Sequence, residues 1–262
     1  YEVIAGETRF PFTTEVKPWW IARLPEGRIP AGGQVLASYE YAPEGAMTYC
    51  PSNPRTQAIM KKALQDTATK LGVKRIHIGH DEPRWMNTCK LCKDRGLSNA
   101  ELLSEELTRM NDFVKSANSE ARVMMWADAL NPFHNAPHQN LEPANETVPK
   151  DIIQCTWFYD AHDDLVEGRS LAYFAEKGYE TTGSPWFNLE NNWDWAQECE
   201  IADRCLGMIY TSWGDAGTDH WAGLSVTAAF SWNPSSPEAL EEITWDPAEL
   251  NRCWGVLQNG GE

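Results

Sequence analysis

Two acidic residues that follow a short apolar segment are the first candidates for chemistry in this sequence. Asp81 and Glu82 come directly after His77-Ile-Gly-His80, and residues 75–79 have the apolar character of a buried strand. An isolated Asp-Glu pair is usually part of a solvated loop. A pair that ends a buried strand beside two histidines favours acid/base chemistry instead. We therefore expect Asp81 and Glu82 to be catalytic, and His77 or His80 to orient Asp81.

Tryptophan and further acidic residues occur at the ends of the other predicted strands. Those strands span residues 122–127, 152–158, 179–183 and 207–213, and the chain contains 13 Trp. Indole rings cover the apolar C–H faces of a sugar while carboxylates accept hydrogen bonds from its hydroxyl groups. We therefore expect a sugar pocket whose substrate-binding residues are His77, His80, Trp126, Asp128, Trp157, Tyr159, Trp186, Trp213 and Asp215.

Helix signals alternate with these strands. Asn53-Pro54 is typical of an N-cap followed by proline at the first helical position, and the helix that it opens should end at Gly72. Ser98 and Glu101 form a capping box for a second helix. Weaker helical patterns occur at residues 171–177, at 193–205 and after 221. Most successive strands begin about 30 residues apart, which is the spacing of βαβ units.

Repeated βα units fold into a (β/α)8 barrel or a doubly wound sheet. A doubly wound sheet needs a glycine-rich turn after its first strand, and this sequence has none. Five βα units account for the chain from about residue 73, and the first 50 residues offer only two strand candidates, at 2–5 and 34–39. We therefore predict an α/β fold of the (β/α)8 TIM-barrel type, incomplete at the N-terminus. It forms a single domain over residues 1–262, with partial units at 1–50 and βα units at 51–262.

Charge and hydropathy exclude two classes of partner. The chain has 38 acidic against 22 basic residues, a net charge of −16, and no run of Lys or Arg that would bind a phosphate backbone. It also contains no stretch of the roughly 20 apolar residues that cross a bilayer. We therefore expect no nucleic-acid partner and no membrane span.

Cysteine spacing does not predict a metal site. A structural zinc site needs four ligands, usually from paired motifs, and Cys89-x-x-Cys92 is the only C-x-x-C in the chain. We expect these two residues to form a disulfide or a reduced pair that shapes the loop after the acidic pair. The remaining cysteines are scattered: Cys50, Cys155, Cys199, Cys205 and Cys253.

Several of these motifs together resemble a known enzyme family. Cys50-Pro-Ser-Asn-Pro54, a helix and then His77-Ile-Gly-His-Asp-Glu82 are similar to the centre of family 20 glycoside hydrolases, the β-N-acetylhexosaminidases. In that family the fourth barrel strand ends in His-x-Gly-Gly-Asp-Glu. The resemblance covers about residues 48 to 225, and three more segments fall in the order of the fifth, sixth and eighth strands: residues 125–128, 153–157 and 213–215.

Two positions depart from the family pattern. His80 stands where the family commonly has glycine, and the Tyr-Leu-Asp usual after the seventh strand is not evident. That missing motif would hold the carbonyl of the substrate's acetamide group. Tyr159, on a different strand, is the substitute candidate.

The resemblance implies substrate-assisted hydrolysis of a glycan that carries β-linked N-acetylhexosamine. Glu82 would be the general acid, kept protonated by an apolar wall. Asp81, kept ionised by hydrogen bonds, would accept the acetamide N–H and stabilise the positive intermediate. The reaction needs neither a metal nor an organic cofactor.

Two other interpretations remain open at this point. One is a two-carboxylate glycosidase in which Asp128, Asp160 or Asp215 partners Glu82. Asp81 is poorly placed as that partner, because retaining enzymes need carboxyls about 5–5.5 Å apart and neighbours on a strand point to opposite sides. The other is a sugar-binding module without turnover. It depends on the N-terminal sugar ligands, for which the only stand-ins are Arg9, Glu7 and Glu15.

Overall fold

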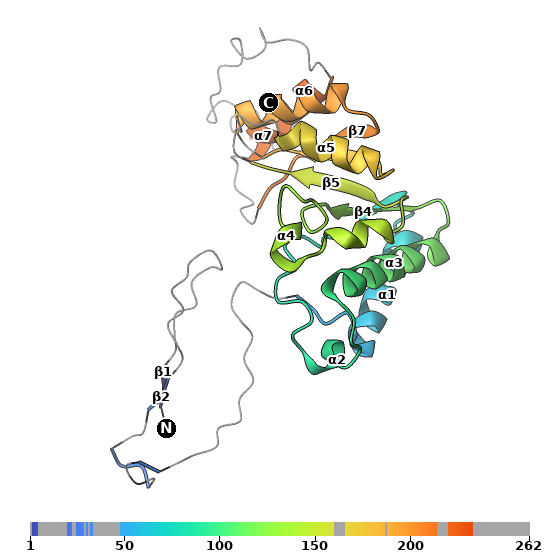
Figure 1. Ribbon diagram of the computed structural model, residues 1–262. Coiled ribbons are helices and arrows are strands. Elements are labelled where there is room, and N and C mark those ends of the chain that lie inside the picture. Colours follow the sequence, from blue (N-terminus) through green and yellow to red (C-terminus); the bar gives the residue numbers. More distant parts are fainter. Residues whose placement is uncertain are drawn as a thin grey trace, which may run out of the picture.

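The computed structural model describes most of the central part of the chain. The described residues are 2–4, 20–22, 25–28, 30, 32–33, 48–159, 166–186, 188–213 and 220–232. Strands and helices alternate from residue 54 to residue 232, as the βα spacing predicted (Figure 1). The fold of this part is therefore α/β.

A parallel sheet of five strands forms its centre. The strands are paired in the order in which they occur in the chain, and every pairing is parallel. A doubly wound sheet reverses its strand order at one point, whereas the wall of a barrel does not. Among the described strands the sheet is open, because its two outer strands each pair on one side only. The strands are β3 (Arg75–His77), β4 (Arg122–Trp126), β5 (Ile153–Trp157), β6 (Thr181–Ser184) and β7 (Cys205–Met208).

The two helices with cap signals begin where the sequence places them. Asn53 caps the first long helix by accepting a hydrogen bond from the N–H of Arg55, and the capping box of Ser98 and Glu101 is present in both directions. Leu71 is the C-cap of the first helix, one residue before Gly72. The long helices are α1 (Pro54–Lys70), α3 (Asn99–Ala117), α5 (Val166–Glu176), α6 (Leu189–Ile201) and α7 (His220–Trp232). The short ones are α2 (Lys90–Lys93), α4 (Ala136–Gln139) and the 3₁₀ helix η1 (Glu142–Glu146).

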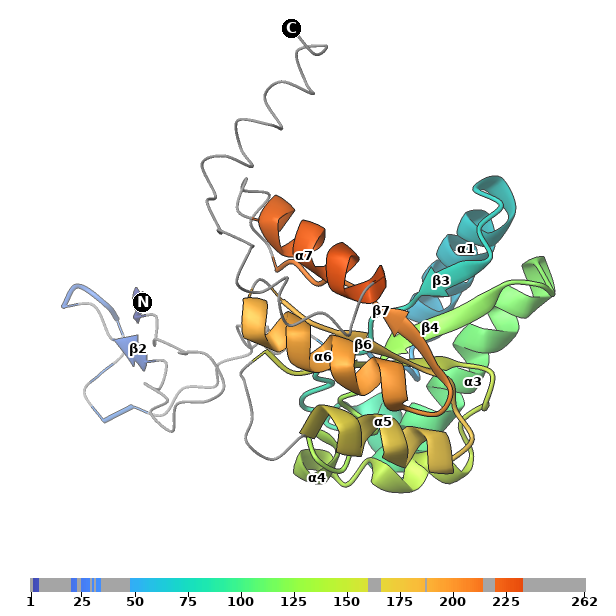
Figure 2. The ribbon, with the colours of Figure 1, turned by 90° about the horizontal axis from the view of Figure 1, so that it is seen from above.

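The two faces of the sheet bury different side chains. On one face Val123 and Met125 of β4 pack with Leu107 and Met110 of α3, and all four are fully buried. The main helices gather on that side of the strands (Figure 2). Burial of each such side chain contributes about 1.5–3 kcal/mol, so this contact fixes where β4 lies. The opposite face carries the alternate residues, among them Met124, packed in a smaller cluster.

Several boundaries differ from the sequence prediction. Helices α5 and α6 begin at Val166 and Leu189, before the predicted starts at residues 171 and 193. Helix α6 ends at Ile201 and β7 begins at Cys205, although the apolar pattern predicted helix through residue 205 and a strand at 207–213. The apolar sequence pattern continues past the end of α6 because Ala202 and Cys205 pack against the same buried cluster as the helix. The turn itself is made at Arg204, which has a left-handed φ of 62°.

The N-terminal strand is not part of the parallel sheet. β1 (Glu2–Ile4) lies where a strand was predicted, but it pairs antiparallel with β2 (Trp20–Ala22) in a separate two-stranded sheet. The other predicted strand, at 34–39, lies outside the described residues. None of the helices in the described part of the chain is both long and apolar enough to cross a membrane.

Candidate active site

The acidic pair lies in a tightly turned loop after β3. The strand stops at His77, and the backbone of Gly79, His80 and Glu82 then adopts left-handed φ angles of 74°, 70° and 44°. Left-handed backbone at a non-glycine residue costs of order 1 kcal/mol and persists only where the surroundings enforce it. Because the pair follows the strand, the alternation of side chains along a strand does not set the directions of Asp81 and Glu82. Both side chains are partly buried at the carboxyl edge of the sheet.

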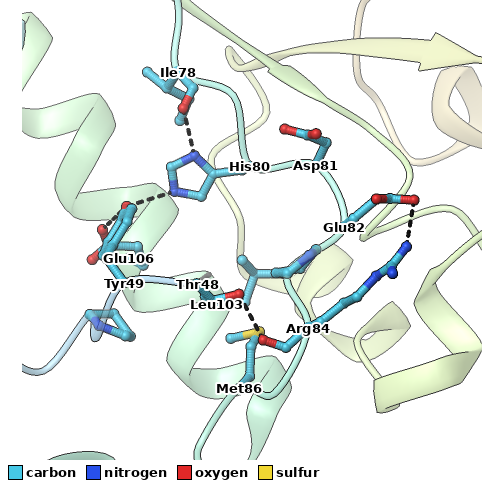
Figure 3. A pocket seen from close by; sticks show the side chains of 12 residues that line it. Thr48, Tyr49, Ile78, His80, Asp81, Glu82, Arg84, Met86, Leu103 and Glu106 are labelled. Atoms are coloured by element: carbon cyan, nitrogen blue, oxygen red, sulfur yellow. Dashed lines mark hydrogen bonds and ion pairs between the residues drawn. The ribbon is translucent and has the colours of Figure 1, made fainter. Parts of the chain in front are cut away.

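Glu82 is held at its backbone and at its side chain. Its N–H donates a 2.8 Å hydrogen bond to Oδ2 of Asp128, and its Oε1 lies 2.8 Å from a guanidinium nitrogen of Arg84 (Figure 3). The apolar wall expected around Glu82 is therefore replaced on one side by a cation. For Glu82 to act as an acid, its proton must sit on Oε2, or Arg84 must move away.

Asp128 lies just past the end of β4 and is only 1% exposed. Its carboxylate accepts hydrogen bonds from the N–H of Glu82, from Nδ2 of Asn135 at 2.8 Å and from Nε1 of Trp157 at 3.2 Å. Burial raises the pKa of Asp128 to about 6, although these three donors lower it. Asp128 therefore links the loop that carries Glu82 to the tryptophan at the end of β5.

His80 turns toward α3. Its Nδ1 donates a 2.9 Å hydrogen bond to the carbonyl of Ile78, and its Nε2 lies 3.1 Å from the hydroxyl of Tyr49 (Figure 3). That hydroxyl donates its proton to the buried carboxylate of Glu106, at 2.5 Å, and Glu106 is paired with Arg109. Burial lowers the pKa of His80, and the carboxylate of Glu106 opposes that shift. His80 is thus engaged with residues that sequence reasoning did not include.

His77 packs on the ring of Trp126, with the ring centroids 4.4 Å apart. Its Nδ1 accepts a hydrogen bond from the N–H of Gly79 at 3.1 Å, so a neutral His77 carries its proton on Nε2. Partial burial, and then the neighbouring His80, lower the pKa of His77. His77 is therefore poised as a neutral donor beside an indole face.

The predicted aromatic residues form one continuous network of rings. Trp126 contacts Trp213 with centroids 5.8 Å apart, and Nε1 of Trp213 donates a 2.8 Å hydrogen bond to the hydroxyl of Tyr159. Tyr159 in turn stacks on Trp157 at 5.0 Å and meets Trp186 at 5.5 Å. We call these five residues the aromatic network. It joins residues at or beyond the ends of four strands, and Trp157 connects it to Asp128.

A pocket of about 290 Å³ contains the acidic pair. Asp81, Glu82 and His80 line it together with Tyr49 and Arg84, between the loop and α3. No member of the aromatic network lines this pocket, and Asp128 is the link between the two. The remaining predicted ligand, Asp215, lies outside the described residues, as do Asp160, Arg9, Glu7 and Glu15.

Sequence reasoning missed residues that the fold brings to the site. Glu106 had a readable signal, because it interrupts the apolar stripe of α3 between Leu103 and Leu107 and is buried there. His134 lies in a loop rich in proline and asparagine that gives no sign of burial, yet its ring centroid lies 4.1 Å from that of Trp157 and 4.5 Å from that of Phe158. The others had no local signal: Tyr49, Arg84 and Asn135.

A comparison with known protein families finds a match. Residues 20–202 match the family model described as glycosyl hydrolase family 20, catalytic domain, and this segment is more than half of the chain. No protein with a curated description matches the chain.

Proposed function

The chain belongs to glycosyl hydrolase family 20, which makes it a glycoside hydrolase domain, and we propose that it hydrolyses β-linked N-acetylhexosamine by a substrate-assisted, retaining mechanism. One observation carries the proposal: Asp81 and Glu82 occupy a strained loop at the carboxyl end of β3, and Asp128 fixes the backbone of that loop. Barrel enzymes place their catalytic residues at this end of their strands.

In the proposed first step the substrate's own acetamide oxygen attacks the anomeric carbon. The bond from that carbon to the leaving oxygen breaks, and Glu82 gives its proton to the leaving oxygen. In the second step water attacks the same carbon, Glu82 takes up the proton of that water, and the acetamide group is restored. Configuration is retained because the anomeric carbon is inverted twice.

Asp81 acts on the acetamide group in this proposal. Its carboxylate accepts the acetamide N–H and so increases the negative charge on the attacking carbonyl oxygen. It then faces the positive, oxazolinium-like intermediate and stabilises that charge. Asp81 and Glu82 are adjacent but need not share a direction, since the left-handed backbone at Glu82 separates them.

In this proposal the hydroxyl of Tyr159 donates a hydrogen bond to the acetamide carbonyl of the substrate. Its oxygen accepts the N–H of Trp213 and its hydroxyl also interacts with Thr211, and on substrate binding its own proton would be donated to the acetamide oxygen. Burial raises the pKa of Tyr159, so the hydroxyl keeps that proton at neutral pH. The indole faces of the aromatic network supply apolar surface for the sugar ring.

Asp128 has a positional part in the proposal. Both of its carboxylate oxygens are occupied and the residue is 1% exposed, so no surface remains for a substrate atom. The same burial argues against Asp128 as the nucleophile of a two-carboxylate mechanism. Its task is to hold the Glu82 backbone and the Trp157 ring in one geometry.

The fold part of the proposal is a single domain of the (β/α)8-barrel type. Strands β3 to β7 would be the fourth to eighth strands of that barrel. The uninterrupted strand order and the helices gathered on one face support this assignment.

Chromogenic substrates test the proposed function directly. We expect release of chromophore from an N-acetylglucosaminide or N-acetylgalactosaminide, and none from the plain glucoside or galactoside, because only the former carry the acetamide nucleophile. Equal turnover of the plain sugars would indicate a two-carboxylate enzyme. Saturable binding of N-acetylglucosamine without any turnover would indicate a sugar-binding module.

A further inference from the structure

The fold brings a third cysteine to the C-x-x-C motif. Sγ of Cys50 lies 3.3 Å from Sγ of Cys89 and 3.5 Å from Sγ of Cys92, and the three sulfur atoms are all within 4.8 Å of one another. All three cysteines are free. They come from two segments that are 39 residues apart in the chain, so their meeting is a product of the tertiary structure.

The spacing of the sulfurs suits one shared cation. Zn–S bonds of about 2.3 Å in a tetrahedron place neighbouring sulfurs about 3.8 Å apart, whereas a disulfide brings two sulfurs to about 2.05 Å. One disulfide among the three thiols would also leave the third sulfur unused. Three soft donors at these separations favour a thiophilic divalent ion such as Zn²⁺ over hard cations.

The surroundings of the sulfurs also suit a bound ion. Cys92 is buried and Cys50 is partly buried, and Sγ of Cys92 lies 3.2 Å from Oγ of Ser52. Cysteine binds a metal as the thiolate, and a divalent ion between the sulfurs would offset the repulsion among three thiolates.

We propose that Cys50, Cys89 and Cys92 bind a Zn²⁺ ion, with a water molecule as the fourth ligand. The ion would join the loop that carries the acidic pair to the segment before α1. Thr48 and Tyr49 in that segment already contact the loop, through the carbonyl of Arg84 at 2.7 Å and through His80 at 3.1 Å. The zinc would thus hold together two segments that line the pocket, the loop with Asp81 and Glu82 and the segment with Thr48 and Tyr49.

Metal content of the purified full chain tests this proposal, and the result does not depend on any glycosidase activity. Protein produced in zinc-supplemented medium should carry about one Zn²⁺ per chain, and Cys89→Ser should reduce this to about a tenth or less. Cys205→Ser is the matched control, because it removes a partly buried thiol from β7 instead, and it should keep the zinc. Circular dichroism confirms that each variant is folded.

Thiol accessibility in the unmutated protein keeps the test valid if Cys89→Ser fails to fold. Removal of zinc by a chelator should expose three additional thiols to an alkylating reagent, and peptide mapping should assign them to Cys50, Cys89 and Cys92. Cobalt added to the chelated protein should give the near-ultraviolet absorption of thiolate-to-cobalt charge transfer. Absence of zinc with all three thiols freely alkylated, a mapped disulfide between any two of them, or iron in place of zinc would each overturn the proposal.

Discussion

Glu82 and Asp128 follow two neighbouring strands, β3 and β4, and the two side chains lie in opposite surroundings. After β3 the chain turns through left-handed residues, and the side chain of Glu82 keeps 32% of its surface exposed beside a pocket. After β4 the carboxylate of Asp128 is buried beneath three donors. The comparison teaches that an acid at a strand end can serve chemistry or architecture, and that burial and partners decide which.

The largest effect should come from the exposed member of this pair. Glu82→Gln keeps the size of the side chain but removes the transferable proton, so kcat on an unactivated N-acetylhexosaminide should fall about 10²–10⁴-fold. The melting temperature should hardly change, because within the described part of the chain the side chain makes one partly exposed ion pair. Steady-state kinetics and thermal melts of the two proteins check this. A variant with full activity would place the acid elsewhere.

The buried member should show the reverse pattern. In Asp128→Asn the new NH₂ group must face one of the N–H groups that now donate hydrogen bonds to the carboxylate. The free energy of unfolding should therefore fall by about 1–3 kcal/mol. We expect activity to fall about tenfold through the displaced Glu82 backbone. Asp66→Asn, on the exposed face of α1, is the matched control and should change neither quantity. Loss of activity without loss of stability would make Asp128 a catalytic residue.

The same residue should give a pH signature. The folded-state pKa of Asp128 is raised to about 6, so the folded protein binds its proton more tightly than the unfolded chain does. The stability that this proton contributes is fully present at about pH 4 and is lost as pH rises through about 6. The melting temperature of the wild type relative to Asp128→Asn should therefore fall over that interval. A difference that is flat or that rises with pH contradicts the assigned shift.

Sequence reasoning could go far on the fold and less far on this comparison. Strand spacing, the Asn53 cap and the capping box of Ser98 predicted the βα order and the helix starts. Both acids, however, have the same local signature, a carboxyl after an apolar strand with a nearby tryptophan. What separates them is the set of donors to Asp128, two of which, the N–H of Glu82 and Nε1 of Trp157, come from segments 46 and 29 residues away. Cys50 escaped notice for the same reason, since no spacing rule links it to Cys89.

A smaller effect should separate two exposed tryptophans. Trp213 belongs to the aromatic network and is 41% exposed. Trp213→Leu should raise KM about three- to tenfold, because stacking of this kind is worth about 0.5–1.5 kcal/mol. The melting temperature should change little. Trp232, 89% exposed at the end of α7, is the control, and Trp232→Leu should leave KM unchanged. Equal effects of the two substitutions would remove the network from substrate binding.

The smallest effect should come from the support behind His80. Tyr49→Phe removes the hydroxyl between His80 and Glu106, and we expect a loss of about 1 kcal/mol in stability and a fall in kcat of two- to fivefold. Tyr173→Phe removes a hydroxyl that bonds Glu142 on the surface and should leave kcat unchanged. Chemical denaturation and kinetics measure both. If Tyr49→Phe affects kcat as strongly as Glu82→Gln, the hydroxyl takes part in the chemistry.

The central claim is that adjacent carboxyls divide the work of substrate-assisted hydrolysis, and leaving-group dependence tests it most directly. Glu82→Gln and Asp81→Asn are compared on N-acetylhexosaminides with strongly and weakly acidic leaving groups. A very acidic leaving group needs little protonation, so the account predicts that it partly rescues Glu82→Gln. Asp81→Asn should be equally impaired on every N-acetyl substrate, because the charge that faces the intermediate is gone. Rescue of Asp81→Asn alone would mean that the roles are reversed, and activity that neither substitution changes would contradict the account.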